Sequence, residues 1–364
     1  MGVQTARGST VLHRATSPDT GTRIEALPRE RRTWVTLAVL GVGLVVLVVL
    51  SFPLGRFSVP AGTVLRVLAS RVVPVDVTWT PAVETVVTQI RLPRILGALL
   101  VGAALSASGA AYQSMFRNPL VSPAILGVSA GAGFGAALGI LLHTPWWTVQ
   151  VLAFAFGLVA TLVSVGIGKT LGDGSLVVLV LAGMVVSALF QAFISLTQYV
   201  ANPDDTLPAI TFWLMGGLGK VRMDDLLLPA VLTLVCLAAL WALRWPINVL
   251  AAGDDEARTL GVNRTLVWGV VIGSATVLTA NAVSLAGIIG WVGLIMPHAA
   301  RMVVGPGFDR LLPASVLLGA GFLLIVDDVA RTASAVELPL GILTAVIGAP
   351  CFLVLLARSR RQWV

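Results

Sequence analysis

Eight long stretches of the chain contain no charged side chain, and this feature constrains the fold more than any other. An α-helix needs about 20 mostly apolar residues to cross the hydrocarbon core of a bilayer. Only 11% of the residues are charged and 57% are hydrophobic, so a single aqueous core could not hide these stretches. We therefore expect an all-α polytopic membrane protein. The stretches are residues 33–55, 95–116, 118–168, 174–203, 226–243, 265–300, 311–326 and 338–357.

Two of the stretches are too long for one crossing, and each contains a natural break, at HTPWW (143–147) and around TANAVSLAG (279–287). Dividing them at these points predicts ten transmembrane helices. The expected spans are residues 34–54, 95–115, 122–142, 147–168, 176–198, 226–244, 265–282, 286–303, 311–329 and 338–357.

The orientation follows from the basic residues, because loops rich in Lys and Arg stay in the cytoplasm. With the N-terminus inside, 16 of the 24 Lys and Arg residues fall on the inner side. We expect a disordered cytoplasmic tail over residues 1–33, a permease domain over 34–357 with a cytoplasmic loop at 246–264, and a cytoplasmic C-terminal tail over 358–364.

Catalysis on this chain is not expected. GKT at 168–170 resembles the end of a phosphate-binding loop, but Val163 stands where that loop needs glycine. His13, His143 and His298 have no acid or cysteine at metal-site or triad spacing, so we predict no metal site. The chain is expected to be a transporter or a scaffold.

A run of glycines with a period of four lies in GVSAGAGFGAALG (127–139). Residues four apart share one face of a helix, and small residues on that face let two helix backbones approach closely in lipid. We interpret the run as a helix-packing face rather than a dinucleotide fingerprint. Its members are Gly127, Gly131, Gly135 and Gly139.

The predicted fifth span carries a polar stripe with the same period. Ser187, Gln191 and Ser195 share a face, and Gln198 lies one turn further on. Polar side chains at membrane depth face the bundle interior or a watery path. The stripe therefore predicts either hydrogen bonds between helices or the lining of a translocation path.

Three arginines at span ends oppose the positive-inside bias on the predicted outer side: Arg91 and Arg94 of RLPR, and Arg331. They either pair with nearby acids or form docking points for an acidic partner, because guanidinium binds carboxylates through two parallel hydrogen bonds. The acids nearest Arg331 are Asp327, Asp328 and Glu337.

The segment AAGDDEARTLG (251–261) contains the only three consecutive acids of the chain, within the predicted cytoplasmic loop. Acids in the first turn, Arg258 near the end and Gly261 as a left-handed cap predict a short helix that matches the helix dipole. Ala257 and Leu260 are expected to share a face. Such a helix is either a docking element or a solvated connection.

Residues 91–133, RLPRILGALLVGAALSASGAAYQSMFRNPLVSPAILGVSAGAG, closely resemble the signature of the FecCD-type iron-chelate and vitamin B12 importer permeases, the membrane subunits of type II ABC importers. The resemblance continues in LAGMVVSAL, FWLMGGLG, AAGDDEARTLG, GIIGWVGLIMPHAAR and ELPLGILTAVIGAPCFLVLL, and it covers residues 34–357.

The resemblance implies the type II importer permease fold and a subunit that pairs with a second copy or a homologue. It also implies two cytoplasmic ATPase subunits, which bind ATP and Mg²⁺, and an extracytoplasmic substrate-binding protein. The expected function is the import of an iron chelate, a ferric siderophore first, across the cytoplasmic membrane of a prokaryote by alternating access. Heme, cobalamin or an oxyanion are alternative cargoes. A stand-alone secondary transporter or channel is the alternative of a different class.

The resemblance also assigns residues. It implies docking to the binding protein at Arg91, Arg94 and Arg331, and it favours a path lined by Ser187, Gln191, Ser195 and Gln198. A cytoplasmic gate is expected near Gly174, at Ser175, Leu176 and Val177. Coupling to the ATPase is assigned to Gly253, Asp254, Asp255, Glu256, Ala257, Arg258, Leu260 and Gly261.

Overall fold

The computed structural model describes residues 29–55, 57–71, 73–74, 76–172, 175–334 and 336–359, and their regular structure is entirely helical. The helices are α1 (Arg29–Ser51), α2 (Ala61–Ala69), α3 (Pro81–Thr85), the π-helix η1 (Val86–Arg91), α4 (Leu92–Met115), the 3₁₀-helix η2 (Pro123–Leu126), α5 (Val128–Leu141), α6 (Trp146–Gly172), α7 (Leu176–Val200), α8 (Thr206–Leu214), the 3₁₀-helix η3 (Met223–Asp225), α9 (Leu227–Ala242), α10 (Arg244–Ala252), α11 (Asp254–Thr259), α12 (Arg264–Ala286), α13 (Val292–Val304), α14 (Phe308–Thr332) and α15 (Leu340–Ser359). The predicted tail 1–33 thus ends in helix from Arg29, and residues 1–28 and 360–364 lie outside the described residues.

Seven helices of the described chain are long and apolar enough to cross a membrane. They are Arg31–Ser51, Pro81–Met115, Trp146–Gly172, Leu176–Val200, Met223–Ala242, Arg264–Ala286 and Phe308–Thr332. Three shorter apolar helices are Val128–Leu141, Val292–Val304 and Leu340–Leu355. Each of the ten predicted spans overlaps one of these helices, so the uncharged stretches locate the apolar helices of the fold.

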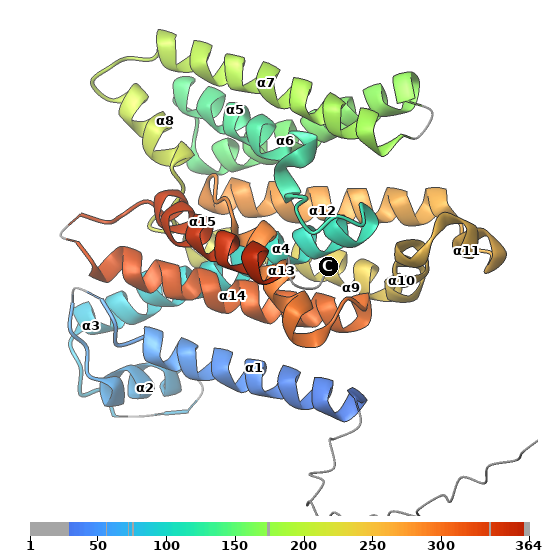
Figure 1. The fold of residues 1–364 in the computed structure, drawn as a ribbon. Helices are drawn as coiled ribbons and strands as arrows, with labels where there is room; N and C mark the ends of the chain where they lie inside the picture. Colours follow the sequence, from blue (N-terminus) through green and yellow to red (C-terminus); the bar gives the residue numbers. More distant parts are fainter. Residues whose placement is uncertain are drawn as a thin grey trace, which may run out of the picture.

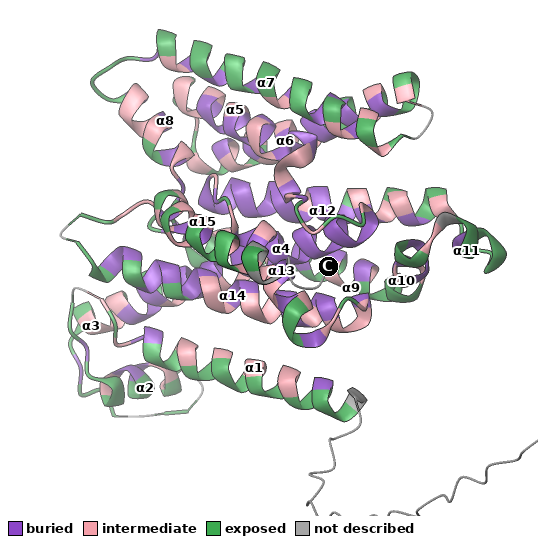
Figure 2. Cartoon of the chain, viewed as in Figure 1, coloured by how far each residue is buried: buried purple, intermediate pink, exposed green. Residues whose placement is uncertain are grey.

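Helix α4 is the central element of the bundle. Nearly every residue from Pro93 to Met115 is buried, and α4 packs against α12, α13 and α14. Figure 2 shows the buried residues concentrated on the helices around α4, whereas α1 and α7 carry mostly exposed ones. A helix buried on all sides needs no amphipathic pattern, which explains why α4 reads as uniformly apolar and small.

Helices α5 to α8 gather on one side of the bundle, and α1 lies on the opposite side (Figure 1). Within this group α5 packs on α6 through glycines. A Cβ on Gly131 would lie 2.4 Å from the carbonyl oxygen of Phe156, and one on Gly135 would lie 2.2 Å from that of Leu152. At these two positions only hydrogen permits the approach. Gly139 faces Val149 less closely, because a Cβ there would lie 3.1 Å from the Val149 Cα atom.

The fourth glycine of the run behaves differently. Gly127 precedes α5 in the left-handed conformation, at φ 84°, and it faces Val186 and Ser187 of α7 instead of α6. Its role is to end η2 and let the chain turn into α5, because a left-handed backbone favours glycine.

The predicted break around 279–287 lies at the last residue of that stretch, a few residues later than the predicted spans place it. Helix α12 continues to Ala286, and the chain breaks at Gly287, which adopts φ 71°. Asn281 lies inside the helix because its amide donates to the carbonyl of Pro229 at 2.9 Å and to the hydroxyl of Thr233 at 3.1 Å on α9. This neighbour satisfies a polar group that would otherwise favour a turn, so α13 begins later than predicted, at Val292.

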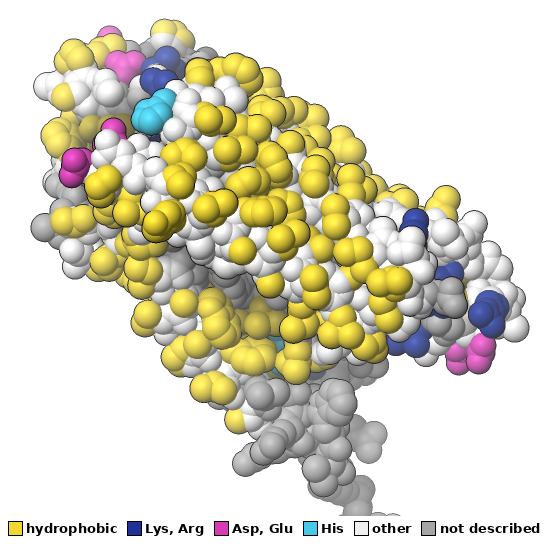
Figure 3. Space-filling view, turned by 90° about the horizontal axis from the view of Figure 1, so that it is seen from above, with side chains coloured by type: hydrophobic (Ala, Val, Ile, Leu, Met, Phe, Trp, Pro, Cys, Tyr) yellow, Lys and Arg dark blue, Asp and Glu magenta, His cyan; other side chains and the backbone are white. Residues whose placement is uncertain are grey.

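The surface of the bundle matches a membrane environment. Figure 3 shows hydrophobic side chains over the middle of the molecule and charged side chains gathered at its two ends. In Figure 1 one end carries α10 and α11, and the opposite end carries α2 and α3. The best candidate functional sites lie at these two ends.

Candidate functional sites at the two ends of the bundle

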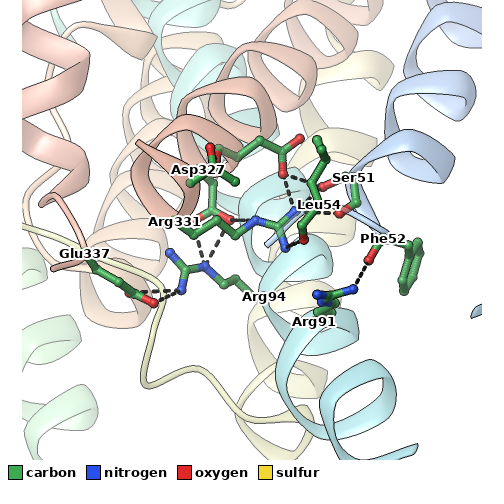
Figure 4. Close-up of polar contacts among 10 residues, drawn as sticks. Ser51, Phe52, Leu54, Arg91, Arg94, Asp327, Arg331 and Glu337 are labelled. Atoms are coloured by element: carbon green, nitrogen blue, oxygen red, sulfur yellow. Dashed lines mark hydrogen bonds and ion pairs between the residues drawn. The ribbon is translucent and has the colours of Figure 1, made fainter. Parts of the chain in front are cut away.

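The end that carries α2 and α3 contains a cluster of arginines (Figure 4). Arg91 is the last residue of the π-helix η1, and Pro93 follows in the first turn of α4. Proline has no N–H to donate, so the ordinary helical hydrogen bond at this point is missing and a wider turn forms. The guanidinium of the buried Arg91 donates to the carbonyls of Phe52 and Phe57, in the chain that leaves α1.

Arg94 lies one turn further along and bridges two acids. One of them belongs to α14, and the other belongs to the loop that follows α14. Its Nε donates to the Asp327 carboxylate at 2.9 and 3.0 Å, and its Nη1 donates to the Glu337 carboxylate at 2.9 and 3.0 Å. The Asp327 side chain is fully buried, whereas that of Glu337 is 48% exposed. Arg94 therefore links a buried acid to an acid at the surface.

Arg331 joins α14 to the end of α1. It donates to the carbonyls of Ser51 and Leu54 at 2.7 and 2.9 Å, and to the Ser51 hydroxyl at 2.7 Å. It also pairs with Asp328, whose carboxylate accepts a 2.6 Å hydrogen bond from the same hydroxyl. Arg91 and Arg331 thus hold the same stretch of chain from two sides.

The structure brings the three predicted docking arginines together and buries all of them. The acid-paired alternative describes Arg94 and Arg331 in the isolated chain, whereas Arg91 binds backbone carbonyls. Removing one partner of a buried ion pair leaves an uncompensated charge, which costs about 3–5 kcal/mol. Docking at these arginines stays a prediction, and any acidic partner would reach the cluster first at the exposed rim formed by Glu337.

The opposite end carries the short helix α11, over Asp254–Thr259. Gly261 follows in the left-handed conformation, at φ 70°. The N–H of Val262 donates to Ala257 O at 2.9 Å, and the N–H of Gly261 donates to Arg258 O at 3.1 Å. This pair of bonds is a Schellman motif, which ends the helix where the sequence places its glycine.

Ala257 of α11 and Leu260, which caps its C-terminus, do not share an exposed face, contrary to expectation. Ala257 is 2% exposed and belongs to the main hydrophobic core, whereas Leu260 is 57% exposed. Ala257 is already covered by this chain and cannot be buried further against a partner. Asp255 and Arg258 point outward, and the side chain of Asp254 lies outside the described residues. The surface available to a partner is therefore Leu260 with its charged neighbours.

The polar stripe of α7 lies on its more open side. Gln191 and Ser195 are exposed, and Ser187 and Gln198 are half-buried. The hydroxyl of Ser187 donates to Gly183 O at 2.7 Å, and that of Ser195 to Gln191 O at 3.1 Å, so both are satisfied within their own helix. Neither hydroxyl requires a neighbouring helix.

The predicted gate residues lie where α7 begins. Ser175 is the N-cap residue of α7 and is exposed, Leu176 is half-buried and Val177 is 67% exposed. Gly174 lies outside the described residues. Within the described residues no group of three His, Cys, Asp or Glu side chains could hold a metal ion.

Several contacts at both ends could not be predicted from the sequence. Asp327 and Asp328 stand near Arg331 in the sequence, but their pairing does not follow from it, and Ser51 has no predicted role. It also missed two contacts of α10: Arg117 donates to the carbonyl of Leu250, and Asn248 accepts from the N–H of Phe308. A backbone carbonyl leaves no signal in a sequence, so such partners appear only in three dimensions.

Apolar helices of spanning length, with charged clusters at the two ends, define a polytopic membrane protein. The chain belongs to the FecCD transport family, whose sequence model matches residues 43–358. It is therefore the permease of an ABC importer, and the family expected from the sequence is confirmed. Members of this family are transport subunits and not catalysts.

Individual relatives agree with the family. The chain is 40% identical over 320 residues to the molybdate import system permease protein MolB of Haemophilus influenzae, covering 87% of this chain and 94% of the relative. It is 40% identical over 279 residues to an "iron chelatin transport system permease protein" of Helicobacter pylori, covering 77% and 84%. A solved structure, described as an inward-facing conformation of a "metal-chelate type ABC transporter", matches with a TM-score of 0.78 and 40% identity over 89% of this chain and 99% of that chain.

Proposed function

We propose that the chain is the permease subunit of an importer that moves an iron chelate, a ferric siderophore first, across the cytoplasmic membrane of a prokaryote. The observation that carries this proposal is the match to the metal-chelate type transporter over 99% of that chain, together with an iron-chelatin relative at 40% identity. Two copies, or one copy and a homologue, would form the path between them. Two ATPase subunits would bind ATP and Mg²⁺, and an extracytoplasmic binding protein would deliver the cargo.

Ten membrane crossings, with both termini in the cytoplasm, complete the proposed topology. Its support is the overlap of every predicted span with an apolar helix. The arrangement puts α10 and α11 on the cytoplasmic side and the arginine cluster outside. A reporter that works only in the cytoplasm should be active when it is fused after residue 359. A reporter that works only outside the cytoplasm should be active when it is inserted near residue 204.

The segment 253–261 is proposed as the contact with the ATPase. Its support is a short helix at one end of the bundle, with Gly253 before it and the exposed Leu260 and then Gly261 after it. Movement of this helix would switch the path between outward and inward access. Such a switch requires the nucleotide-bound ATPase to bind one permease state more tightly than the other.

The path is proposed to pass along the polar stripe of α7, with its inner closure at Ser175, Leu176 and Val177. Exposure of Gln191 and Ser195 in the single chain supports this, because these side chains are free to line a surface shared with a second subunit. Cysteines introduced at these two positions should react with a membrane-impermeant thiol reagent. The expected reactivity should change when the ATPase binds nucleotide.

The test of the cargo is uptake by the reconstituted complex. Proteoliposomes that contain the permease, its ATPase and its binding protein should accumulate a ferric siderophore only when ATP is present on the side of the ATPase. Uptake without a bound ATPase, together with full activity of the Glu256→Lys variant, would instead support a stand-alone transporter.

An oxyanion is the second candidate cargo, and a specific observation favours it. The molybdate permease of Haemophilus influenzae covers more of this chain than the iron-chelatin relative does, 87% against 77%. Radiolabelled molybdate offered to the same proteoliposomes decides between the two. Uptake of molybdate but not of the ferric siderophore would overturn the iron proposal while leaving the importer intact.

A further inference from the structure

Helix α10, which leads into α11, is hydrogen-bonded to the inner end of α4. We call this contact, and the one to α14 described next, the fastenings of α10. Arg117 follows α4 in the left-handed conformation, at φ 51°, and its Nε donates to the carbonyl of Leu250 at 3.0 Å. Its Nη2 donates to the same oxygen. Leu250 is among the last four residues of α10, whose carbonyls have no partner within the helix. A guanidinium at a helix C-terminus also meets the negative end of the helix dipole, so Arg117 caps α10 by hydrogen bonds and by charge.

The same helix is fastened to the first turn of α14. The Oδ1 atom of Asn248 accepts a 2.6 Å hydrogen bond from the N–H of Phe308, and its Nδ2 donates to Asp309 at 3.4 Å. Phe308 is the first residue of α14, where backbone N–H groups have no helical partner. One face of α10 carries Ile247, Val249 and Leu250 into the main core beside these two contacts.

Helices α4 and α14 are themselves locked together along their length. A Cβ on Gly102 would lie 2.3 Å from Gly319 O, and one on Gly319 would lie 2.4 Å from Gly102 O, so the two backbones touch. At the far end Arg94 of α4 pairs with the fully buried Asp327 of α14. The pair is therefore joined at its middle and at its outer end, and α10 joins the two helices at their inner ends.

We propose that Arg117 and Asn248 are positioning residues that make α10 and the α4–α14 pair move as one body. This inference rests on the proposed function, in which the ATPase displaces α11. A displacement of α11 would then pass through α10 to the inner ends of α4 and α14, and from there to the arginine cluster at their outer ends. Loss of either fastening would let α10 move alone, so ATP would be hydrolysed without moving the cargo.

The experiment measures cargo imported per ATP hydrolysed, in proteoliposomes that contain the whole complex. Arg117→Met removes the fastening, and Arg244→Met is the matched control, because Arg244 belongs to α10 but donates to Trp241 O, within three residues of itself. We expect the ratio to fall by at least about fivefold in Arg117→Met and to stay unchanged in Arg244→Met. A loss of folded protein would lower uptake and hydrolysis together and leave the ratio intact.

A second measurement does not depend on transport. Amide hydrogen exchange of α10 in the detergent-purified permease should speed up by about tenfold in Arg117→Met and in Asn248→Ala, because each loses a bond to a helix end. Exchange in the middle of α4 should not change. An unchanged ratio together with unchanged α10 exchange would overturn the inference. Absence of ATP-driven uptake by the wild-type complex would instead count against the proposed function. The hydrogen-exchange result would still show whether Arg117 and Asn248 hold α10 in place.

Discussion

Gly102 of α4 and Gly319 of α14 face each other so closely that a Cβ on either would lie 2.3 or 2.4 Å from the carbonyl oxygen of the other. Both clashes are with backbone, which cannot rotate away. We expect Gly102→Ala and Gly319→Ala each to destabilise the permease by about 1–3 kcal/mol, because overpacking forces the helices apart. Thermal unfolding in detergent measures the effect.

Gly273→Ala is the control for this prediction. Gly273 lies in α12, where an added Cβ would have no neighbouring atom within 4 Å, and its φ is not left-handed. Alanine there should leave the unfolding temperature unchanged or raise it, because alanine favours helix over glycine. Equal losses at Gly102 and Gly273 would show that the close approach of α4 and α14 is not what the substitution disturbs.

The ion pairs of Arg94 should contribute unequally to stability. Asp327→Ala leaves the buried guanidinium without its buried partner and should cost about 3–5 kcal/mol. Glu337→Gln removes a half-exposed charge but keeps an acceptor, and should cost less than about 1 kcal/mol. Unfolding midpoints of the two variants, measured side by side, should therefore differ clearly. Similar midpoints would mean that the buried position of Asp327 does not control the energy of the pair.

In the arginine cluster, the positions of the arginines can be predicted from the sequence, but their partners cannot. Positive-inside counting isolates Arg91, Arg94 and Arg331, and their acids stand out nearby, but the choice between pairing and docking depends on burial. Burial of Arg91 and Arg331 in turn depends on the chain after α1, whose carbonyls both side chains bind. The carbonyls of Phe52 and Leu54 that accept from them carry no mark in the sequence.

Elsewhere too, local features can be predicted from the sequence, and features that depend on distant contacts cannot. Gly261 ends α11 as predicted because a left-handed cap is a local property of the chain. The break in 279–287 comes only at its last residue, later than the predicted spans place it, because Asn281 finds its partners on α9, a distant part of the sequence. The expectation of a shared face for Ala257 and Leu260 fails for a similar reason: helical spacing alone does not show which side of a short helix packs against its own core.

If docking occurs at the arginine cluster, Glu337 should weaken it. Its carboxylate occupies Nη1 of Arg94 and lies at the exposed rim, where it repels an acidic partner. Glu337→Gln should therefore strengthen binding of the substrate-binding protein by roughly two- to fivefold, the scale of one surface charge contact. Surface plasmon resonance with the permease in nanodiscs measures this.

The control is Glu84→Gln, because Glu84 is an acid on α3, at the same end of the bundle, that pairs with the exposed Arg71 and with none of the three arginines of the cluster. This variant should bind the substrate-binding protein as the wild type does. A gain of affinity in both variants would indicate a general charge effect, and no gain in Glu337→Gln would remove Arg94 from the docking surface.

Two substitutions in the α11 segment separate its outer face from its inner face. Leu260→Asp changes an exposed side chain, so the unfolding temperature of the isolated permease should not change, while binding of the ATPase should weaken at least about tenfold. Ala257→Leu forces extra volume into the core and should destabilise the permease itself by about 1–3 kcal/mol. Co-purification with the ATPase, read beside the unfolding temperature of the permease alone, distinguishes the two effects. If Leu260→Asp retains the ATPase at wild-type stoichiometry, α11 is a connecting loop and the contact lies elsewhere at that end of the bundle.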